Sequence, residues 1–254
     1  MARVVKEATT LQRQALIAFL AGASTWLVAA GSIWLVARSR PHDLNGLLLF
    51  FIPVGLFGIA KKVTDFTLIY IRGYLGERRV FAELRKLPDD YWIFNDVTIR
   101  VGEDSAQIDH ILVSPYGLWC IETKSLRGTI RGKENERHWT QIKRPDSGRT
   151  RREKFYNPVA QNATHCRRLG EYLKQHLGVT LPVRSAVVFT GAQLEVDTAT
   201  PAVSTRELRG VIQRSDTQAC LEESKLRVIL DALTQRERPR EQPIPPAEDA
   251  PTTC

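Results

Sequence analysis

Three ionisable side chains interrupt two apolar stretches near the middle of the chain. Asp109 lies within Ala106–Ser114, and Glu122 and Lys124 lie within Leu118–Lys124. Both stretches are rich in β-branched and aromatic residues, which is typical of strands. A charge buried in a sheet is costly unless something compensates for it. A divalent cation is one good candidate, because two carboxylates are ligands that such an ion accepts.

The turn between the two strands decides whether these carboxylates can meet. If Pro115-Tyr116 is a two-residue loop, Ser114 pairs with Gly117 and Asp109 falls opposite Glu122. A type I turn with a bulge at Gly117 is the alternative, since Pro115 disfavours the primed two-residue turns. That longer loop would place Asp109 and Glu122 on opposite faces of the sheet. A catalytic pair of carboxylates therefore requires the even register, or a compensating bulge within one strand.

Further elements flank this predicted hairpin. The pattern predicts a helix from Lys61 to about Leu87, a strand over Tyr91–Arg100, and a short strand over Gly128–Gly132. Asn157-Pro158 predicts the start of a helix that ends at Gly178. Apolar Val183–Thr190 predicts an interior strand. On the helix that begins at Asn157-Pro158, Gln161 and His165 lie on one stripe. On the helix from Lys61 to about Leu87, Glu77 lies where a solvated charge is expected.

The segment Arg127–Arg152 is strongly basic. A run of this kind is usually a solvated loop. Beside a carboxylate cluster it could equally be a rim that positions the phosphates of a nucleic acid, with Arg131 and Lys133 among the contacts. The sequence leaves both interpretations open.

The N-terminal part has a different character. Ala15–Ala37 contains no charge and is long enough to cross a bilayer as a helix, and Leu44–Ala60 is a second uncharged run. Two packed core helices are the alternative, but the all-round apolar character favours a transmembrane hairpin with helices at about 15–37 and 44–60. Lipid is thus an expected partner of residues 15–60.

Basic residues flank the outer ends of this hairpin more densely than its link. The positive-inside rule then places both the N-terminus and the C-terminal portion in the cytoplasm, as a multi-pass protein of the inner membrane. The whole chain of 254 residues carries a net charge of +8, which suits a polyanionic partner but equally a basic membrane protein. The four cysteines have no zinc spacing, so no zinc is expected and the thiols indicate a reducing compartment.

The predicted organisation divides the chain into five parts. They are a transmembrane hairpin (1–62), a helical connector (63–75), a catalytic-type domain (76–190), peripheral helices (191–234) and a disordered tail rich in Arg, Glu and Pro (235–254).

The order of helix, strand, hairpin with Asp…Glu-x-Lys, helix and strand resembles the PD-(D/E)xK nuclease core. More narrowly, the chain resembles nuclease-related domain (NERD) proteins. The residues that carry the likeness are Gly76-Glu77, Gln107–His110, Gly117, Glu122–Lys124, Gly128, Trp139, Asn157-Pro158 and Gln161. The match covers about Gly76 to Thr190. The motif aspartate Asp109 is not part of a Pro-Asp pair, since Ile108 precedes it.

The resemblance implies an α/β, restriction-endonuclease-like fold with a central mixed sheet flanked by helices. It also implies that Asp109, Glu122 and the Thr123 carbonyl hold Mg²⁺ or Mn²⁺, and that Lys124 orients water or stabilises charge on the phosphate. Glu77 would complete the metal shell through a water. Substrate contacts would come from Asn157, Gln161, His165, Arg131 and Lys133, while His110 and Trp139 would be structural.

Two functions follow as expectations. The first is a membrane-tethered, metal-dependent nuclease that acts on cytoplasmic nucleic acid. DNA is favoured over RNA as its substrate. The second is a catalytically inactive module on the same fold that binds nucleic acid or a partner at the membrane. Retention of Asp109, Glu122 and Lys124 together favours the first, because a binding module needs only the basic rim.

Overall fold

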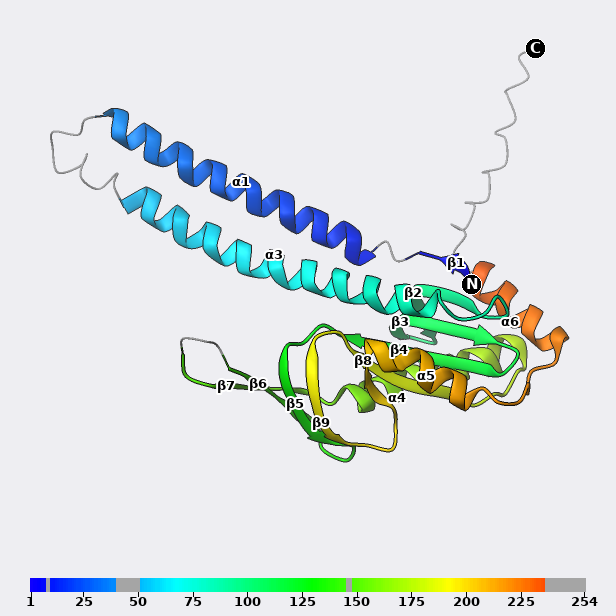
Figure 1. Cartoon of the computed structure of the whole chain (residues 1–254). Coiled ribbons are helices and arrows are strands. Elements are labelled where there is room, and N and C mark those ends of the chain that lie inside the picture. Colours follow the sequence, from blue (N-terminus) through cyan, green and yellow to red (C-terminus); the bar gives the residue numbers. More distant parts are fainter. Residues whose placement is uncertain (8–9, 40–50, 145–147, 236–254) are drawn as a thin grey trace, which may run out of the picture.

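A six-stranded mixed sheet forms the centre of the molecule (Figure 1). The structure, a computed structural model, describes residues 1–7, 10–39, 51–144 and 148–235. The strands run in the order β1-β2-β3-β4-β8-β10, and their bounds are β1 (Arg3–Lys6), β2 (Trp92–Val101), β3 (Asp104–Ser114), β4 (Gly117–Lys124), β8 (Val183–Phe189) and β10 (Ala202–Ser204). The pairs β2–β3 and β3–β4 are antiparallel, whereas β1–β2, β4–β8 and β8–β10 are parallel.

Helices cover both faces of this sheet, which explains why its strands are apolar almost throughout. On one face, α4 (Pro158–Leu177) and α6 (Glu223–Gln235) pack over a core that includes Phe94, Ile111 and Leu173. On the other, the C-terminal part of α3 (Phe51–Leu84) and α5 (Thr205–Ser215) pack over a core that includes Val80 and Ile121. The expected mixed α/β architecture, a sheet between helices, is confirmed.

A second, four-stranded sheet lies beside the first in the order β7-β6-β5-β9. Its strands are β5 (Gly128–Lys133), β6 (His138–Lys143), β7 (Arg151–Tyr156) and β9 (Ala192–Asp197). Trp139 fills its core, with its ring stacked 6.3 Å from that of Phe189 and its Nε1 donating to the Lys133 carbonyl at 2.8 Å. Trp139 is therefore structural, as predicted.

This sheet corrects two sequence predictions. The basic segment Arg127–Arg152 is not a single loop, because most of it forms β5, β6 and the start of β7. Residues 191–234 do not hold helices alone, since their first part supplies β9 and β10 as well as α5 and α6. The signal for β9 was present: Ala192, Leu194 and Val196 face the core and alternate with polar residues, the period of a strand.

The helices α1 (Thr10–Ser39) and α3 form a long antiparallel pair that projects from the sheets (Figure 1). Small residues such as Ala29 and Ala60 are buried at their contact, and Thr67 Oγ1 donates to the Ala18 carbonyl at 2.8 Å. The predicted connector, 63–75, is an uninterrupted part of α3.

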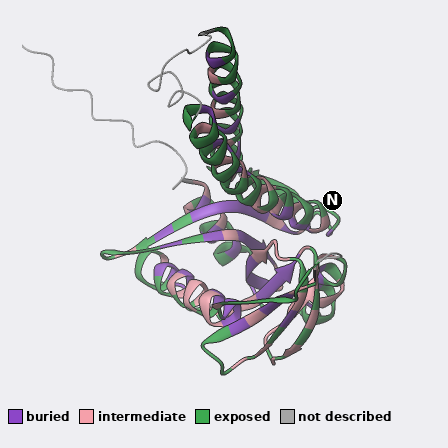
Figure 2. Cartoon of the chain, turned by 90° about the vertical axis from the view of Figure 1, so that its left-hand side faces the viewer, coloured by how far each residue is buried: buried purple, intermediate pink, exposed green. Residues whose placement is uncertain are grey.

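Most of the outer surface of this pair is exposed (Figure 2), and many of its exposed side chains are large and apolar. Leu27 is 74% and Trp34 61% exposed, although such side chains are normally buried. Within the described residues, one helix, Thr10–Arg38, is long and apolar enough to cross a membrane. The second predicted span, 44–60, lies partly outside the described residues, as does nearly all of the predicted tail, 235–254.

Strand β1 was not predicted from the sequence. It pairs with β2 in parallel, Asn95 Nδ2 donates to the Lys6 carbonyl at 2.7 Å, and Ala2 is buried in the core beneath α3. The residues before α1 and those after α3 are thus joined in one sheet.

Candidate active site

The central sheet forks at the point where the predicted carboxylates lie. Ser114 pairs with Gly117, and the β3–β4 pairing runs from there to His110 opposite Ile121. The turn is thus the two-residue loop, and Asp109 and Glu122 follow directly on either side of the last pair. Beyond this point β3 stays paired with β2 and β4 with β8, so the two strands diverge. Of the two registers that the sequence left open, the structure has the even one, which a shared site of Asp109 and Glu122 requires.

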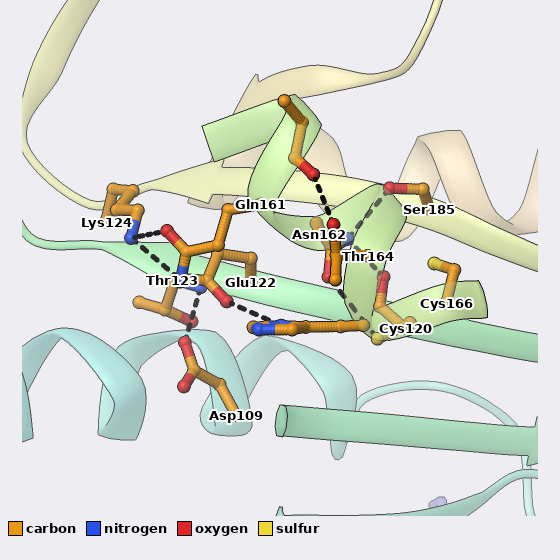
Figure 3. Close-up of polar contacts among 12 residues, drawn as sticks. Asp109, Cys120, Glu122, Thr123, Lys124, Gln161, Asn162, Thr164, Cys166 and Ser185 are labelled. Carbon is orange, nitrogen blue, oxygen red and sulfur yellow. Dashed lines mark hydrogen bonds and ion pairs between the residues drawn. The ribbon is translucent and has the colours of Figure 1, made fainter. Parts of the chain in front are cut away.

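Asp109 is fixed across the fork by the backbone of β4. The Thr123 N–H donates to Asp109 Oδ2 at 2.7 Å (Figure 3). His110, the next residue, points the other way, is fully buried, and lies with Nδ1 2.6 Å from Asn95 Oδ1. His110 is therefore structural, as expected from the alternation of side chains along a strand.

Glu122 and Lys124 are organised by helix α4. Lys124 Nζ donates to Glu122 Oε1 at 2.7 Å and to Gln161 Oε1 at 2.9 Å, and Gln161 Nε2 donates to the same Glu122 oxygen at 2.9 Å (Figure 3). His165, one turn further along α4, places Nδ1 3.4 Å from Glu122 Oε2. The predicted Gln161/His165 stripe thus faces the Glu-x-Lys strand.

Two buried asparagines place α4 in this position. Asn157 caps its N-terminus by accepting from the Val159 N–H at 2.9 Å, and its amide donates to backbone carbonyls of the β5–β6 turn. Asn162 donates to the Cys120 and Ala186 carbonyls, which ties the helix to β4 and β8. Asn157 is fully buried and its polar atoms are engaged, so this geometry argues against the predicted substrate contact.

Helix α3 brings Glu77 to the same place. Gly76 allows the close approach: a Cβ at this position would lie 1.7 Å from Ser125 Oγ. Glu77 is not the solvated charge that its helical position suggested, because it lines one cleft together with Asp109 and Glu122. The helix spacing alone contains no sign of this, since the contact depends on how α3 crosses the sheet.

Asp96 is a fourth carboxylate that the sequence did not reveal. It follows Asn95 in β2, where the regular pairing with β3 is interrupted, and it has a left-handed φ of 55°. Its Oδ1 accepts from Gln107 Nε2 at 2.6 Å and its Oδ2 from the Thr10 N–H at 3.0 Å. Asp96 therefore fastens the first turn of α1 to the edge of the cleft.

The cleft has a volume of about 510 Å³ and is mainly polar. Its lining includes all four carboxylates, Gln161, His165 and Arg168, and the first turns of α1 contribute Leu11 and Gln14. Arg131 and Lys133 line a different hollow on the second sheet, and Arg131 Nε is paired with Glu195 Oε2 at 2.5 Å. The structure thus unites Asp109, Glu122, Glu77, Gln161 and His165, but not the two predicted basic contacts.

The carboxylates repel one another in this setting. Burial, and then the charges of Glu122 and Glu77, raise the pKa of Asp109 well above its ordinary value. Burial together with Asp96 and Glu122 raises the pKa of Glu77 to about 7. Burial opposes the charge of Glu122 too, but hydrogen bonds and charge from His165 and Lys124 hold its pKa below the ordinary value. A site of this kind gains from an added positive charge.

The donor set can be tested against the divalent ion that the sequence predicts. Carboxylate and carbonyl oxygens are hard ligands that suit Mg²⁺ or Mn²⁺, and the pKa of Asp109 is raised first by burial and then by the neighbouring carboxylates, both of which a bound cation would offset. Among the described residues, however, no group of three His, Cys, Asp or Glu side chains converges closely enough to hold a metal ion. The chemistry of Asp109, Glu122 and Thr123 fits the ion as a partial set, which leaves room for water and substrate oxygens.

Comparison with known proteins finds a family match over the segment that contains this site. A sequence model of the family described as Nuclease-related domain (NERD) matches residues 72–190. An uncharacterized protein of Bacillus anthracis is 33% identical over 134 residues, which cover 52% of this chain and 58% of that protein. No solved structure matches the chain. Residues 72–190 are thus similar to the nuclease-related domain, and the matched segment includes Glu77, Asp109, the Glu122–Lys124 strand and Gln161.

Proposed function

We propose that the chain is a membrane-anchored, divalent-metal-dependent nuclease that hydrolyses phosphodiester bonds of cytoplasmic nucleic acid, DNA before RNA. One observation carries the proposal: Asp109 and Glu122 meet at the fork of the sheet, beside a lysine that Gln161 holds in place. The nuclease-related domain at residues 72–190 supports the same chemistry.

Asp109, Glu122 and the Thr123 carbonyl would hold the ion. When bound, a divalent ion polarises a phosphate oxygen and lowers the pKa of a water nucleophile. The chain's own part is positioning. The Thr123 N–H fixes Asp109, while Glu122 and Gln161 together fix the Lys124 ammonium, which can orient the nucleophile or stabilise charge on the phosphate. Glu77 lines the same cleft, where it can accept a hydrogen bond from a water.

The test uses the full chain in detergent or nanodiscs, because β1 belongs to the central sheet. Linear, circular and single-stranded DNA, and RNA, are incubated with Mg²⁺, Mn²⁺ or EDTA. Asp109→Asn and Lys124→Met should each lower cleavage by roughly 10²–10⁴-fold, since each removes a group that acts on the reacting phosphate.

Exposed residues of the same types provide matched controls: Asp197→Asn on β9 and Lys174→Met on α4 should cleave like the parent. Cleavage that is equal in all variants, or that persists in EDTA, would contradict the proposal and indicate a contaminating nuclease.

A binding module without catalysis is the second candidate, and one observation favours it. The Glu122 carboxylate is already engaged by Lys124, Gln161 and His165, so an ion would have to compete for its oxygens. In this case the wild-type chain would bind nucleic acid in a salt-sensitive way, without metal-dependent cleavage, and binding would survive Asp109→Asn.

The proposed anchor is the α1–α3 pair. The exposed apolar side chains around α1 would be covered by lipid, and no charge lies between Ala15 and Ala37. Since β1 and β2 pair in one sheet, the chain must leave the domain and return to the same side. If α1 crosses the bilayer, α3 must provide the return crossing. The basic flanks then favour the inner membrane with both ends in the cytoplasm.

A further inference from the structure

The β6–β7 hairpin carries a concentration of positive charge away from the cleft. Its basic residues are Lys143, Arg144, Arg149, Arg151, Arg152 and Lys154, of which all but Lys143 are exposed. Glu153 offsets part of this charge through its ion pair with Lys143 at 2.6 Å. None of these residues lines the cleft that holds Asp109.

The hairpin has a definite direction relative to the anchor. In Figure 1 β6 and β7 extend from the body of the domain towards the same side as the projecting ends of α1 and α3. β7 is the outer strand of its sheet. Arg151 and Arg152 are exposed on this strand, one on each face of the sheet, so the edge of the sheet presents positive charge on that side.

The apolar surface of α3 comes close to the domain. Phe66 is 64% and Ile69 62% exposed, and Tyr70 is also exposed, although these residues follow the charged Lys61-Lys62. This part of α3 lies level with the start of the apolar run of α1, as the hydrogen bond between Thr67 and Ala18 shows. Exposed aromatic and apolar side chains among lysines are typical of the headgroup layer of a bilayer.

We propose that the β6–β7 hairpin docks on the anionic headgroups of the membrane in which the chain is anchored. The inference rests on the proposed anchoring. Tyr70 is only seven residues before Glu77, so a headgroup layer at Tyr70 would leave the domain lying on the membrane rather than on a stalk. Arginine guanidinium groups bind phosphate oxygens through paired hydrogen bonds, and a negative surface potential attracts basic segments within a Debye length.

A headgroup contact explains the position of this charge better than a nucleic-acid contact does. The carboxylates define where a scissile phosphate would lie, and the hairpin contributes nothing to that cleft. Docking at a second point would also fix the rotation of the domain about the α1–α3 axis, and with it the direction in which the cleft opens.

The experiment uses the full chain in nanodiscs, with a fluorescent probe at the exposed position Thr150→Cys in a background where Cys220 and Cys254 are replaced by serine. The discs are either zwitterionic or contain about one-third phosphatidylglycerol, and both contain a nitroxide-headgroup lipid as quencher. Quenching of the probe should be several-fold stronger in anionic discs and should fall at high salt. A probe at Gln213→Cys on α5 should show no such dependence.

Charge-reversal variants identify the residues that bring the probe close to the anionic headgroups. R151E/R152E should abolish the lipid-dependent quenching, and R149E, which lies outside the strand, should reduce it if the strand variant folds poorly. The control R206E/R209E reverses two exposed arginines on α5 and should leave quenching unchanged. Thermal melting of each variant verifies that the domain is folded.

Several results would overturn the inference. Equal quenching in both kinds of disc would show that the hairpin does not meet the headgroups. If R151E/R152E leaves quenching unchanged but weakens the binding of duplex DNA, the partner of the hairpin is nucleic acid. A chain that does not co-elute with the discs at all would instead refute the anchoring itself.

Discussion

Gln161 and Asn157 lie one turn apart at the start of α4 and serve different purposes. Gln161 links Lys124 to Glu122, whereas Asn157 caps the helix and is buried beneath it. Gln161→Ala should therefore lower cleavage by roughly tenfold to a hundredfold with little change in melting temperature, because Lys124 loses its support. Asn157→Ala should lower stability by about 1–2 kcal/mol, the usual value of such a cap. The comparison requires kcat, KM and melting data for both variants.

If Gln161→Ala instead destabilises the chain as much as Asn157→Ala does, the Gln161–Lys124 bond is structural. Gln161→Glu is a useful third variant, since it keeps the acceptor for Lys124 but sets a second carboxylate against Glu122.

His110 supplies a prediction on pH. Burial lowers its pKa from 6.5 to about 4, so the folded chain keeps it neutral while the unfolded chain takes up a proton below pH 6.5. Its contribution to stability is complete above pH 6.5 and is lost as the pH falls towards 4. Because the pKa differs by about 2.5 between the two states, the loss should be on the order of 3 kcal/mol.

Denaturant unfolding in EDTA between pH 7 and 4 measures this, with His110→Gln as the comparison. The free energy of unfolding should fall less steeply with decreasing pH in His110→Gln, because the glutamine cannot take up the proton. If the free energies of unfolding of the two proteins change in parallel with pH, His110 does not cause the pH dependence of stability. Protonation of Glu77 and Asp109 acts in the opposite direction, but it occurs in both proteins and cancels.

The sequence predicts some of these residues and not others, for reasons of distance along the chain. Asp109 and Glu122 belong to one hairpin, so counting residues from the turn was enough to place them together. Asp96 becomes part of the cleft only through a left-handed backbone and a bond to Thr10, 86 positions away. No local pattern encodes a contact of this kind.

At the scale of elements, Gly76 governs how closely α3 approaches the sheet. Gly76→Ala would bring a Cβ to 1.7 Å from Ser125 Oγ and 3.0 Å from Ser125 Cβ. We expect a loss of about 1–3 kcal/mol and weaker cleavage, because α3 must move and carries Glu77 with it. Adding Ser125→Gly should restore much of the loss, as both clashing atoms are removed.

Gly170, in the middle of α4, is the matched control. A Cβ there meets nothing within 4 Å, so Gly170→Ala should stabilise the chain by about 0.5–1 kcal/mol. Thermal or chemical unfolding of Gly76→Ala, of Gly76→Ala with Ser125→Gly, and of Gly170→Ala measures these changes in stability. A stabilised Gly76→Ala would mean that Ser125 simply rotates away.

Elements differ in how readily the sequence predicts them. α4 has a cap, a proline in its first turn and a glycine at its end, and it was predicted within a residue or two. β7 was missed because its residues Arg151–Lys154 are all polar and exposed, so neither apolar alternation nor a buried face indicates a strand. It forms because β6 offers it an edge.

The proposed anchoring of the molecule through α1 predicts how a single substitution should affect membrane insertion. Leu27 is the most exposed large apolar residue of α1. If α1 crosses a bilayer, Leu27→Lys puts a charge in the hydrocarbon and should cost about 2.5–3.5 kcal/mol of insertion. Membrane fractionation should then show less inserted protein.

The control is Val228→Lys on α6, which is exposed but belongs to the domain, and which should leave insertion unchanged. If Leu27→Lys inserts normally, or improves solubility without loss of membrane-bound protein, α1 lies on an aqueous surface instead. The apolar composition of α1 was evident in the sequence, whereas its antiparallel contact with α3 required the structure.

The parallel pairing of β1 with β2 has a consequence for biosynthesis. Arg3 emerges from the ribosome long before its partner Trp92, and the whole α1–α3 pair is made in between. β1 must therefore stay unpaired until α1 and α3 have formed and brought β2 next to it. Once they have done so, closing this edge costs little additional loop entropy. The sheet is completed by residues that are synthesised before the helical pair, so correct assembly of this pair is a precondition for a finished domain.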